Sequence, residues 1–167
     1  SLADTMRLKN IPCDVIWMDI DYMQNFKIFT FDSTHFPDPK ETNDYLHKND
    51  FKSVWMLDPG IKAEKGFFVY DSGEKINAWV QTRNDSVFLG KVWPGDCVFP
   101  DFTQSKVSKW WGGLYENFMA KGVDGVWNDM NEPAVFETVD WTMPDSNKHV
   151  GDENIKNDIH LRYHNVY

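Results

Sequence analysis

Cysteine is scarce in this sequence, and its scarcity excludes two kinds of structure. Cys13 and Cys97 are the only two among 167 residues, and they stand far apart. A disulfide framework or a structural zinc site needs several cysteines at short spacings. The HExxH motif of zinc enzymes and the D-x-D-x-D-G calcium loop are also absent. We therefore expect neither a metal nor a cofactor.

Positive charge is also in short supply, with 17 Lys and Arg against 26 Asp and Glu and a net charge of −9. Nucleic acid is therefore an unsuitable partner, because phosphate binding needs a basic excess. No apolar run approaches the roughly 18 to 20 residues of a membrane span. A neutral or cationic ligand fits the acidic balance better. An accessory subunit stays open, and the sequence indicates no compartment.

Two further absences narrow the chemistry. The sequence contains no GxSxG nucleophile elbow and no glycine-rich loop that would cradle a phosphate. It is rich in aromatic residues, at 16% with 8 Trp. Such a content is typical of a large core, and it is also typical of a sugar site, where flat Trp faces pack on pyranose rings.

Three apolar runs share one design, and each ends in acid: "CDVIWMDID", "KSVWMLDPG" and "DGVWNDMNEP". The first ends at Asp19 and Asp21, the second at Asp58 and the third at Asp129. The runs are β-branched and aromatic, do not alternate, and are followed by breaker residues. This pattern predicts short parallel strands that are covered on both faces.

A helix is predicted before each of these strands. The segment 3–10 resembles the last turns of a helix, and the segment 38–50 begins with Asp38 as N-cap, Pro39 and Glu41. From 104 to 121, apolar residues recur at the spacing of one buried helical face. Alternating helices and strands predict an α/β fold with a parallel sheet.

The segment of about 61–99 interrupts this alternation. Turn signals stand at 71–73 and at 84–85, between the short runs "FFVY" and "SVFL". We interpret it as a small β-rich meander carried on a long loop.

The strand-end acids are the candidate functional residues. In parallel α/β folds, ligands bind at the carboxyl ends of the strands. Asp38 and Asp101 are better explained as capping or turn residues. For Asp58 a turn residue and a site residue are both possible roles, because Asp-Pro-Gly is a turn signature. For Asp19, Asp21 and Asp129 we favour a role in a functional site over a structural role.

Carboxylates beside an aromatic-stacked, uncharged substrate suit glycoside hydrolysis, in which one acid attacks the sugar and another protonates the leaving oxygen. Two alternatives remain: a non-catalytic module that binds α-glucan through the same residues, and a βα segment without a site.

The segment "GVWNDMNEP" closely resembles the signature of glycoside hydrolase family 31. The segments "VIWMDIDYM", "FTFD", "FPDP", "WMLDPGI", "VWPG" and "FPDFT" resemble further blocks of that family, in family order. The sequences of these segments are most similar to those of the α-glucosidases that resemble glucosidase II, including the plant heteroglycan glucosidases. This resemblance implies a (β/α)8 TIM barrel and a retaining α-glucosidase that releases terminal α-linked glucose from oligosaccharides or glucans.

The resemblance also implies roles for individual residues. Asp129 matches the catalytic nucleophile. The residues that match the first sugar subsite are Asp19, Ile20, Asp21, Met56, Asp58, Trp93, Trp127 and Met130. Which of Asp19 and Asp21 contacts the sugar directly is left open. Asp21 favours glucose, because the family's α-xylosidases carry an aromatic residue there.

Measured against the family, the whole chain, 1–167, corresponds to part of the catalytic barrel. It supplies about strands two to four, with the insertion of about 61–99 after strand three. The family's acid/base, with a subsite Arg and His, lies beyond Tyr167, and "YHNVY" resembles the helix that leads into strand five. We therefore expect the 167-residue chain alone to be inactive.

Overall fold

The computed structural model of the chain describes residues 1–151, and these fall into two compact units. The first unit contains Ser1–Leu57 and Tyr115–Trp127, and the second contains Asp58–Leu114 and the chain from Asn128 onward. The "YHNVY" segment, which resembles the helix that leads into strand five, lies outside the described residues.

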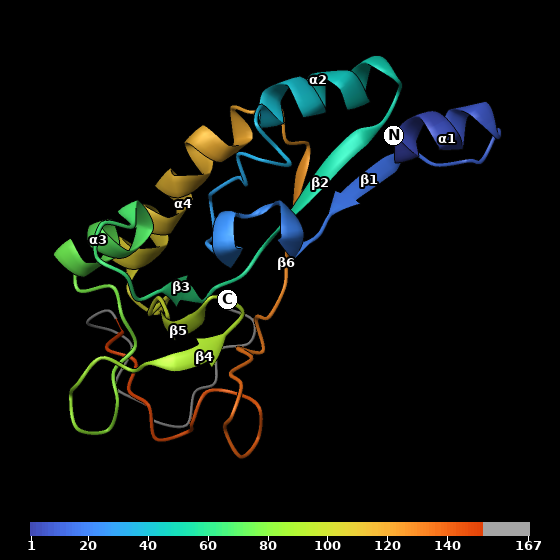
Figure 1. Cartoon of the computed structure of the whole chain (residues 1–167). Helices are drawn as coiled ribbons and strands as arrows, with labels where there is room; N and C mark the ends of the chain where they lie inside the picture. The colour runs from blue at the N-terminus through green and yellow to red at the C-terminus, as the bar shows by residue number, and fades with distance from the viewer. Residues whose placement is uncertain (152–167) are drawn as a thin grey trace. The chain divides into compact units, whose positions relative to one another are not determined.

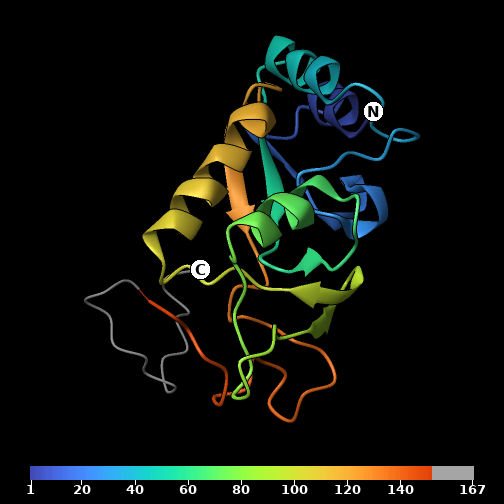
Figure 2. The same cartoon turned by 90° about the vertical axis from the view of Figure 1, so that its left-hand side faces the viewer.

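The first unit is built on a three-stranded sheet in the order β1-β2-β6 (Figures 1 and 2). The strands are β1 (Val15–Met18), β2 (Lys52–Leu57) and β6 (Gly125–Asn128), whose last residue is assigned to the second unit. β1 and β2 run parallel, with Val15 opposite Lys52 and Met18 opposite Trp55. The three apolar runs therefore form the three predicted strands, and they are neighbours in one sheet.

Burial of these strands is less even than the sequence predicts. β2 is buried over most of its length, whereas β1 and β6 are mostly half-buried and Trp17 is 59% exposed. The prediction of covered faces is wrong for β1 and β6. Among residues 1–151 they lie at the two edges of this sheet, with β2 between them.

The predicted helices are confirmed: α1 (Leu2–Leu8), α2 (Pro39–Lys48) and α4 (Ser105–Met119). In α2 the Asp38 carboxylate accepts a hydrogen bond from the Glu41 N–H at 3.0 Å, which is the N-cap that the sequence predicts. On α4, Val107 and Phe118 are fully buried within the predicted apolar face. Two short 3-10 helices, Ile20–Tyr22 and Gln24–Phe26, follow β1.

An aromatic cluster fills the core of the first unit around Trp55, which has no exposed surface. Tyr22 meets Trp55 edge to face at 4.8 Å between ring centroids, and Phe31 stacks on Phe118 at 5.5 Å. The Trp55 indole N–H donates to the buried Asn43 side chain at 3.0 Å. The indole therefore lies in an apolar core with its single polar group satisfied.

The second unit contains an antiparallel sheet in the order β3-β5-β4. The strands are β3 (Ile61–Lys62), β4 (Gly90–Val92) and β5 (Gly95–Val98), and α3 (Phe68–Lys75) lies between β3 and β4 in the chain. A buried apolar cluster of this unit, which includes residues of β4 and β5, consists of Val80, Phe88, Val92, Cys97, Phe99, Val135 and Met143. Burial raises the pKa of the Cys97 thiol to about 12.

The interpretation of 61–99 as β-rich is correct for β3, β4 and β5, and the predicted turn at Asn84 is present. The meander order is wrong, because β3 pairs with β5 and not with the next strand, β4. The interpretation is also wrong for "FFVY", which enters α3, and for the turn at 71–73, which lies inside that helix. A Cβ atom on Gly73 would come within 2.2 Å of the Trp79 ring. That glycine permits a close helix contact and does not mark a turn.

Candidate active site

Asp19, Ile20 and Asp21 lie in the first unit, immediately after β1. The Asp19 carboxylate accepts a hydrogen bond from the Ile20 N–H at 2.7 Å and so caps the short 3-10 helix. Both acids are exposed, and Ile20 is half-buried. The chain leaves the strand through a tight turn that presents two carboxylates to solvent.

Met56 and Trp127 also belong to the first unit, on β2 and β6. Met56 is only 1% exposed, and its carbonyl oxygen accepts the Tyr22 hydroxyl at 2.5 Å. Trp127 is half-buried and meets Trp17 edge to face, with 6.1 Å between the ring centroids. In this unit Trp127 offers an indole surface, whereas Met56 contributes to the core.

A hollow beside Asp21 is the feature of this unit that the sequence analysis missed. Its volume is about 630 Å³, and Asp32 and His35 lie on its wall with their side chains 2.5 Å apart. The hydrogen bond from His35 lowers the pKa of the Asp32 carboxyl. The remaining lining residues are Met23, Asn25, Phe26 and Phe36. Asn25 and Phe26 have φ values of 51° and 58°, and a sequence pattern does not reveal such a backbone.

Asp58 lies in the second unit, directly after β2. Asp58 is buried, with only 2% of its surface exposed. Aspartate is rarely buried to this degree without a specific structural or functional reason. Asp101 is buried to a similar degree, so a role of Asp58 in a sugar site stays a prediction.

Asp129 and Met130 follow β6 in the second unit. Asp129 is half-buried, and Met130 packs against the buried cluster with a φ of 55°. An unbranched residue in this left-handed region carries backbone strain, which concentrates at functional sites. Trp93, at the turn after β4, is 49% exposed and meets Phe136 edge to face at 5.1 Å.

The predicted residues therefore form two groups, each within one unit. The first unit holds Asp19, Ile20, Asp21, Met56 and Trp127, and the second holds Asp58, Trp93, Asp129 and Met130. Asp101 is structural, as predicted, because it is fully buried and accepts hydrogen bonds from Thr103, Gln104 and Val150.

Within residues 1–151, no group of three His, Cys, Asp or Glu side chains is arranged to hold a metal ion. None of the helices described in this range is long and apolar enough to cross a membrane.

Comparison with known proteins decides the family. The TIM-barrel domain of glycosyl hydrolases family 31 matches residues 1–167. The chain belongs to glycoside hydrolase family 31. The α/β architecture is accordingly part of the TIM barrel of this family, as the sequence predicts.

Several proteins named as α-glucosidases resemble the chain. Alpha-glucosidase 2 of Bacillus thermoamyloliquefaciens is 39% identical over 99% of the chain, and human neutral alpha-glucosidase AB is 36% identical over 95%. The chain spans 21% and 16% of these two relatives. A solved structure also matches: the crystal structure of the ER glucosidase II heterodimeric complex, which consists of the catalytic subunit and the binding domain of the regulatory subunit. The match covers 96% of this chain and 18% of the matched chain, with 34% sequence identity and a TM-score of 0.87.

Proposed function

We propose that the natural protein carrying this chain is a retaining α-glucosidase that releases terminal α-linked glucose from oligosaccharides or glucans. The observation that carries this proposal is the family 31 match over the whole chain, together with relatives named as α-glucosidases. The position of Asp129 directly after β6 supports it, because TIM-barrel enzymes carry their catalytic residues at the carboxyl ends of strands.

In the proposed mechanism, the Asp129 carboxylate attacks the anomeric carbon and the bond to the leaving oxygen breaks. A second carboxylic acid, from the family's later strand, protonates that oxygen. A water molecule, deprotonated by the same second group, then hydrolyses the glycosyl ester and restores Asp129. Asp19, Asp21 and Asp58 are proposed to hold the sugar hydroxyls and to stabilise positive charge at the ring carbon.

The aromatic residues are proposed to define the walls of the site. Trp93 and Trp127 both offer partly exposed indole surface, on which the C–H face of a pyranose can pack. Ile20 and Met130 are proposed to complete the apolar lining, and Met56, which is only 1% exposed, to support it from the core. Because this mechanism needs the acid/base from beyond Tyr167, we propose that the 167-residue chain alone does not release glucose from maltose.

The test is a time-resolved NMR spectrum of the natural protein with maltose, nigerose and isomaltose. We expect α-glucose to appear first from at least one disaccharide and to mutarotate afterwards. First appearance of β-glucose would contradict the retaining mechanism. Binding of these sugars without any release would instead support the non-catalytic module.

A further inference from the structure

Tyr22 joins the turn after β1 to the neighbouring strand β2 in the first unit. This turn carries two of the candidate acids, and Tyr22 is the last residue of its 3-10 helix. The register of β1 on β2 ends with Met18 opposite Trp55. The Tyr22 hydroxyl donates to the carbonyl oxygen of Met56, one residue further along β2, at 2.5 Å. The side chain of Tyr22 therefore continues the connection between the two strands beyond the point where their register ends.

The ring of Tyr22 is held in the aromatic core of this unit, and only 1% of the residue is exposed. The ring meets Trp55 at 4.8 Å and Phe36 at 6.4 Å between centroids, both edge to face. Phe31 and Phe118 lie at 5.6 and 6.3 Å from it. Because four rings pack on the phenol and exclude water, its hydroxyl depends on the protein for a hydrogen-bond partner, which the carbonyl on β2 supplies.

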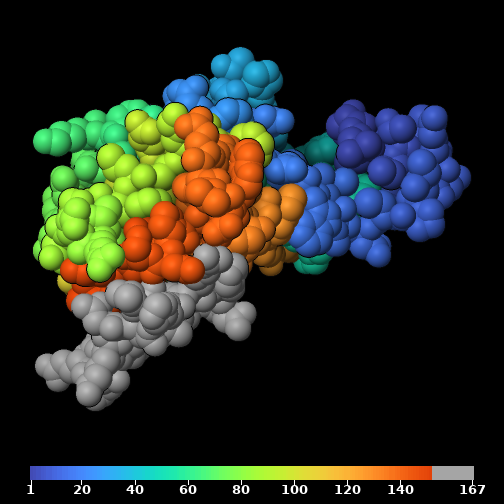
Figure 3. Space-filling view, turned by 90° about the horizontal axis from the view of Figure 1, so that it is seen from below, coloured from blue at the N-terminus to red at the C-terminus, as the bar shows by residue number. Residues whose placement is uncertain are grey.

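The backbone couples Tyr22 to both acids of the turn. Its N–H donates to the Asp19 carbonyl at 3.4 Å, and its carbonyl accepts the Asp32 N–H at 2.7 Å. Asp21 directly precedes Tyr22, and both Asp19 and Asp21 are exposed. In the view from below, blue atoms of the N-terminal part of the chain, which contains both acids, lie at the surface (Figure 3). The chain thus passes from exposed carboxylates to a buried phenol within four residues, so a shift of the phenol moves the acids.

We propose that Tyr22 is a positioning residue for the proposed sugar site, whose hydroxyl holds the carboxylates of Asp19 and Asp21 in place at the carboxyl end of β2. The proposal rests on the proposed function. With 1% of its surface exposed, Tyr22 acts through the two acids and not by contact with the substrate. Hydrogen bonds from sugar hydroxyls to carboxylates depend steeply on geometry. A misplacement of about 1 Å at a site can cost about 100-fold in rate.

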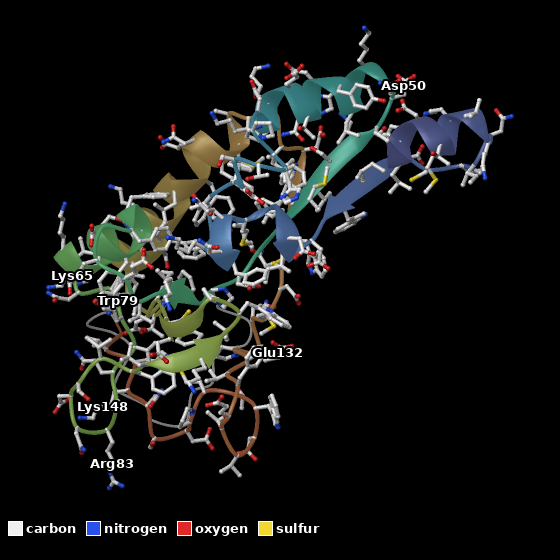
Figure 4. All side chains as sticks on the ribbon, in the orientation of Figure 1. Asp50, Lys65, Trp79, Arg83, Glu132 and Lys148 are labelled. Atoms are coloured by element: carbon white, nitrogen blue, oxygen red, sulfur yellow. The ribbon has the colours of Figure 1, made fainter. Side chains whose placement is uncertain are left out.

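The test compares Tyr22→Phe with Tyr45→Phe in the natural full-length protein. Tyr22→Phe removes one oxygen atom and keeps the ring in the core. Tyr45→Phe is the matched control, because it also removes a hydrogen-bonded hydroxyl, which donates to Asp4. Tyr45 lies on α2, five residues before Asp50, which Figure 4 shows just before β2, at the end of this strand away from Met56. We expect Tyr22→Phe to lower kcat/KM for a nitrophenyl α-glucoside by about ten-fold and Tyr45→Phe to leave it unchanged.

A double-mutant cycle with each acid separates positioning from a general loss of stability. If Tyr22 acts through the acids, its hydroxyl should matter less once an acid has been replaced. We expect the loss caused by Tyr22→Phe to shrink from about ten-fold to less than about three-fold in at least one of the backgrounds Asp19→Asn and Asp21→Asn. General destabilisation would give the same factor in every background. An equal factor in all three backgrounds, or full activity of Tyr22→Phe, overturns the proposal.

Calorimetric binding of maltose by the same variants in an Asp129→Asn background separates this proposal from the proposed function. If the natural protein hydrolyses no α-glucoside, the proposed function fails, and the same cycle is then measured on the Kd of maltose. Weaker binding by Tyr22→Phe than by Tyr45→Phe, with a smaller difference once Asp19 or Asp21 is replaced, supports the positioning role. Equal binding by the two tyrosine variants, or no binding of maltose, overturns it.

Discussion

His47 and Asp124 are joined through an Nε2–Oδ2 distance of 2.6 Å, which links the last turn of α2 to the residue just before β6. The same carboxylate oxygen accepts the Ser53 N–H at 2.9 Å, and the other oxygen accepts the Lys52 ammonium at 3.1 Å. One side chain therefore fastens a helix and two neighbouring strands of the first unit. It does so at the start of the strands, opposite to the ends that carry the candidate acids.

Asp124→Asn is expected to lower the free energy of unfolding by about 1 kcal/mol at neutral pH. This loss is smaller than for a fully buried charged hydrogen bond, because the Asp124 side chain is 21% exposed and solvent screens it. Burial raises the pKa of Asp124, but the Ser53 N–H, His47 and Lys52 outweigh it and hold this pKa at about 2. A lowered acid pKa stabilises the fold above the ordinary value near 3.8, and this stabilisation is lost as the pH falls toward 2.

Denaturant unfolding of both proteins between pH 2 and pH 7 measures this effect. The difference should shrink below about pH 4, where the Asp124 carboxyl of the unfolded chain takes up a proton, and it should be lost as the pH falls through the folded pKa of about 2. Asp44→Asn is the control, because Asp44 pairs with Lys40 on the exposed face of α2 and should contribute little. A difference that stays constant over the whole pH range would contradict the assigned role of Asp124.

Asn43→Ala is expected to destabilise the protein by about 1 to 3 kcal/mol, the cost of leaving a buried polar group unsatisfied. Asn43 accepts the Trp55 indole N–H and donates to the Lys121 carbonyl at 2.8 Å, so both groups lose their partner. Thermal unfolding gives the comparison with Asn117→Ala, an exposed amide on α4. Equal melting temperatures for the two variants would show that the buried network contributes nothing.

The sequence predicts the fold well where pattern and chemistry agree. The three apolar runs form adjacent strands, and Asp38 caps its helix as its spacing to Glu41 predicts. It fails at "FFVY", because aromatic and β-branched residues favour a strand locally while tertiary packing of Gly73 against Trp79 favours a helix. Local propensity is a weak guide where a close contact decides.

The candidate site is predictable only in part, for a similar reason. Position in the chain identifies Asp19, Asp58 and Asp129, because each directly follows a strand. It does not reveal the hollow beside Asp21, since Asn25 and Phe26 on its lining have positive φ values. Such features have no periodicity that a sequence pattern would show.

Asp21→Phe is expected to change the sugar preference of the natural protein. The resemblance to family 31 implies an aromatic residue at this position in α-xylosidases, so the ratio of kcat/KM for an α-glucoside to that for the matching α-xyloside should fall by about 10- to 100-fold. Paired kinetics with nitrophenyl glycosides measure the ratio. Asp14→Phe is the control, because Asp14 is an exposed acid before β1, whereas Asp21 follows this strand. The same ratio in both variants would remove Asp21 from the proposed subsite.

The most direct test of the account is covalent trapping of the natural protein with 5-fluoro-glucosyl fluoride, followed by peptide mass spectrometry. A retaining enzyme accumulates the fluoroglucosyl ester on its nucleophile. We predict one label per active site, on Asp129, and no label in Asp129→Asn. A label on any other carboxylate, or an unlabelled protein that still releases glucose, would contradict the assignment of Asp129 as the nucleophile.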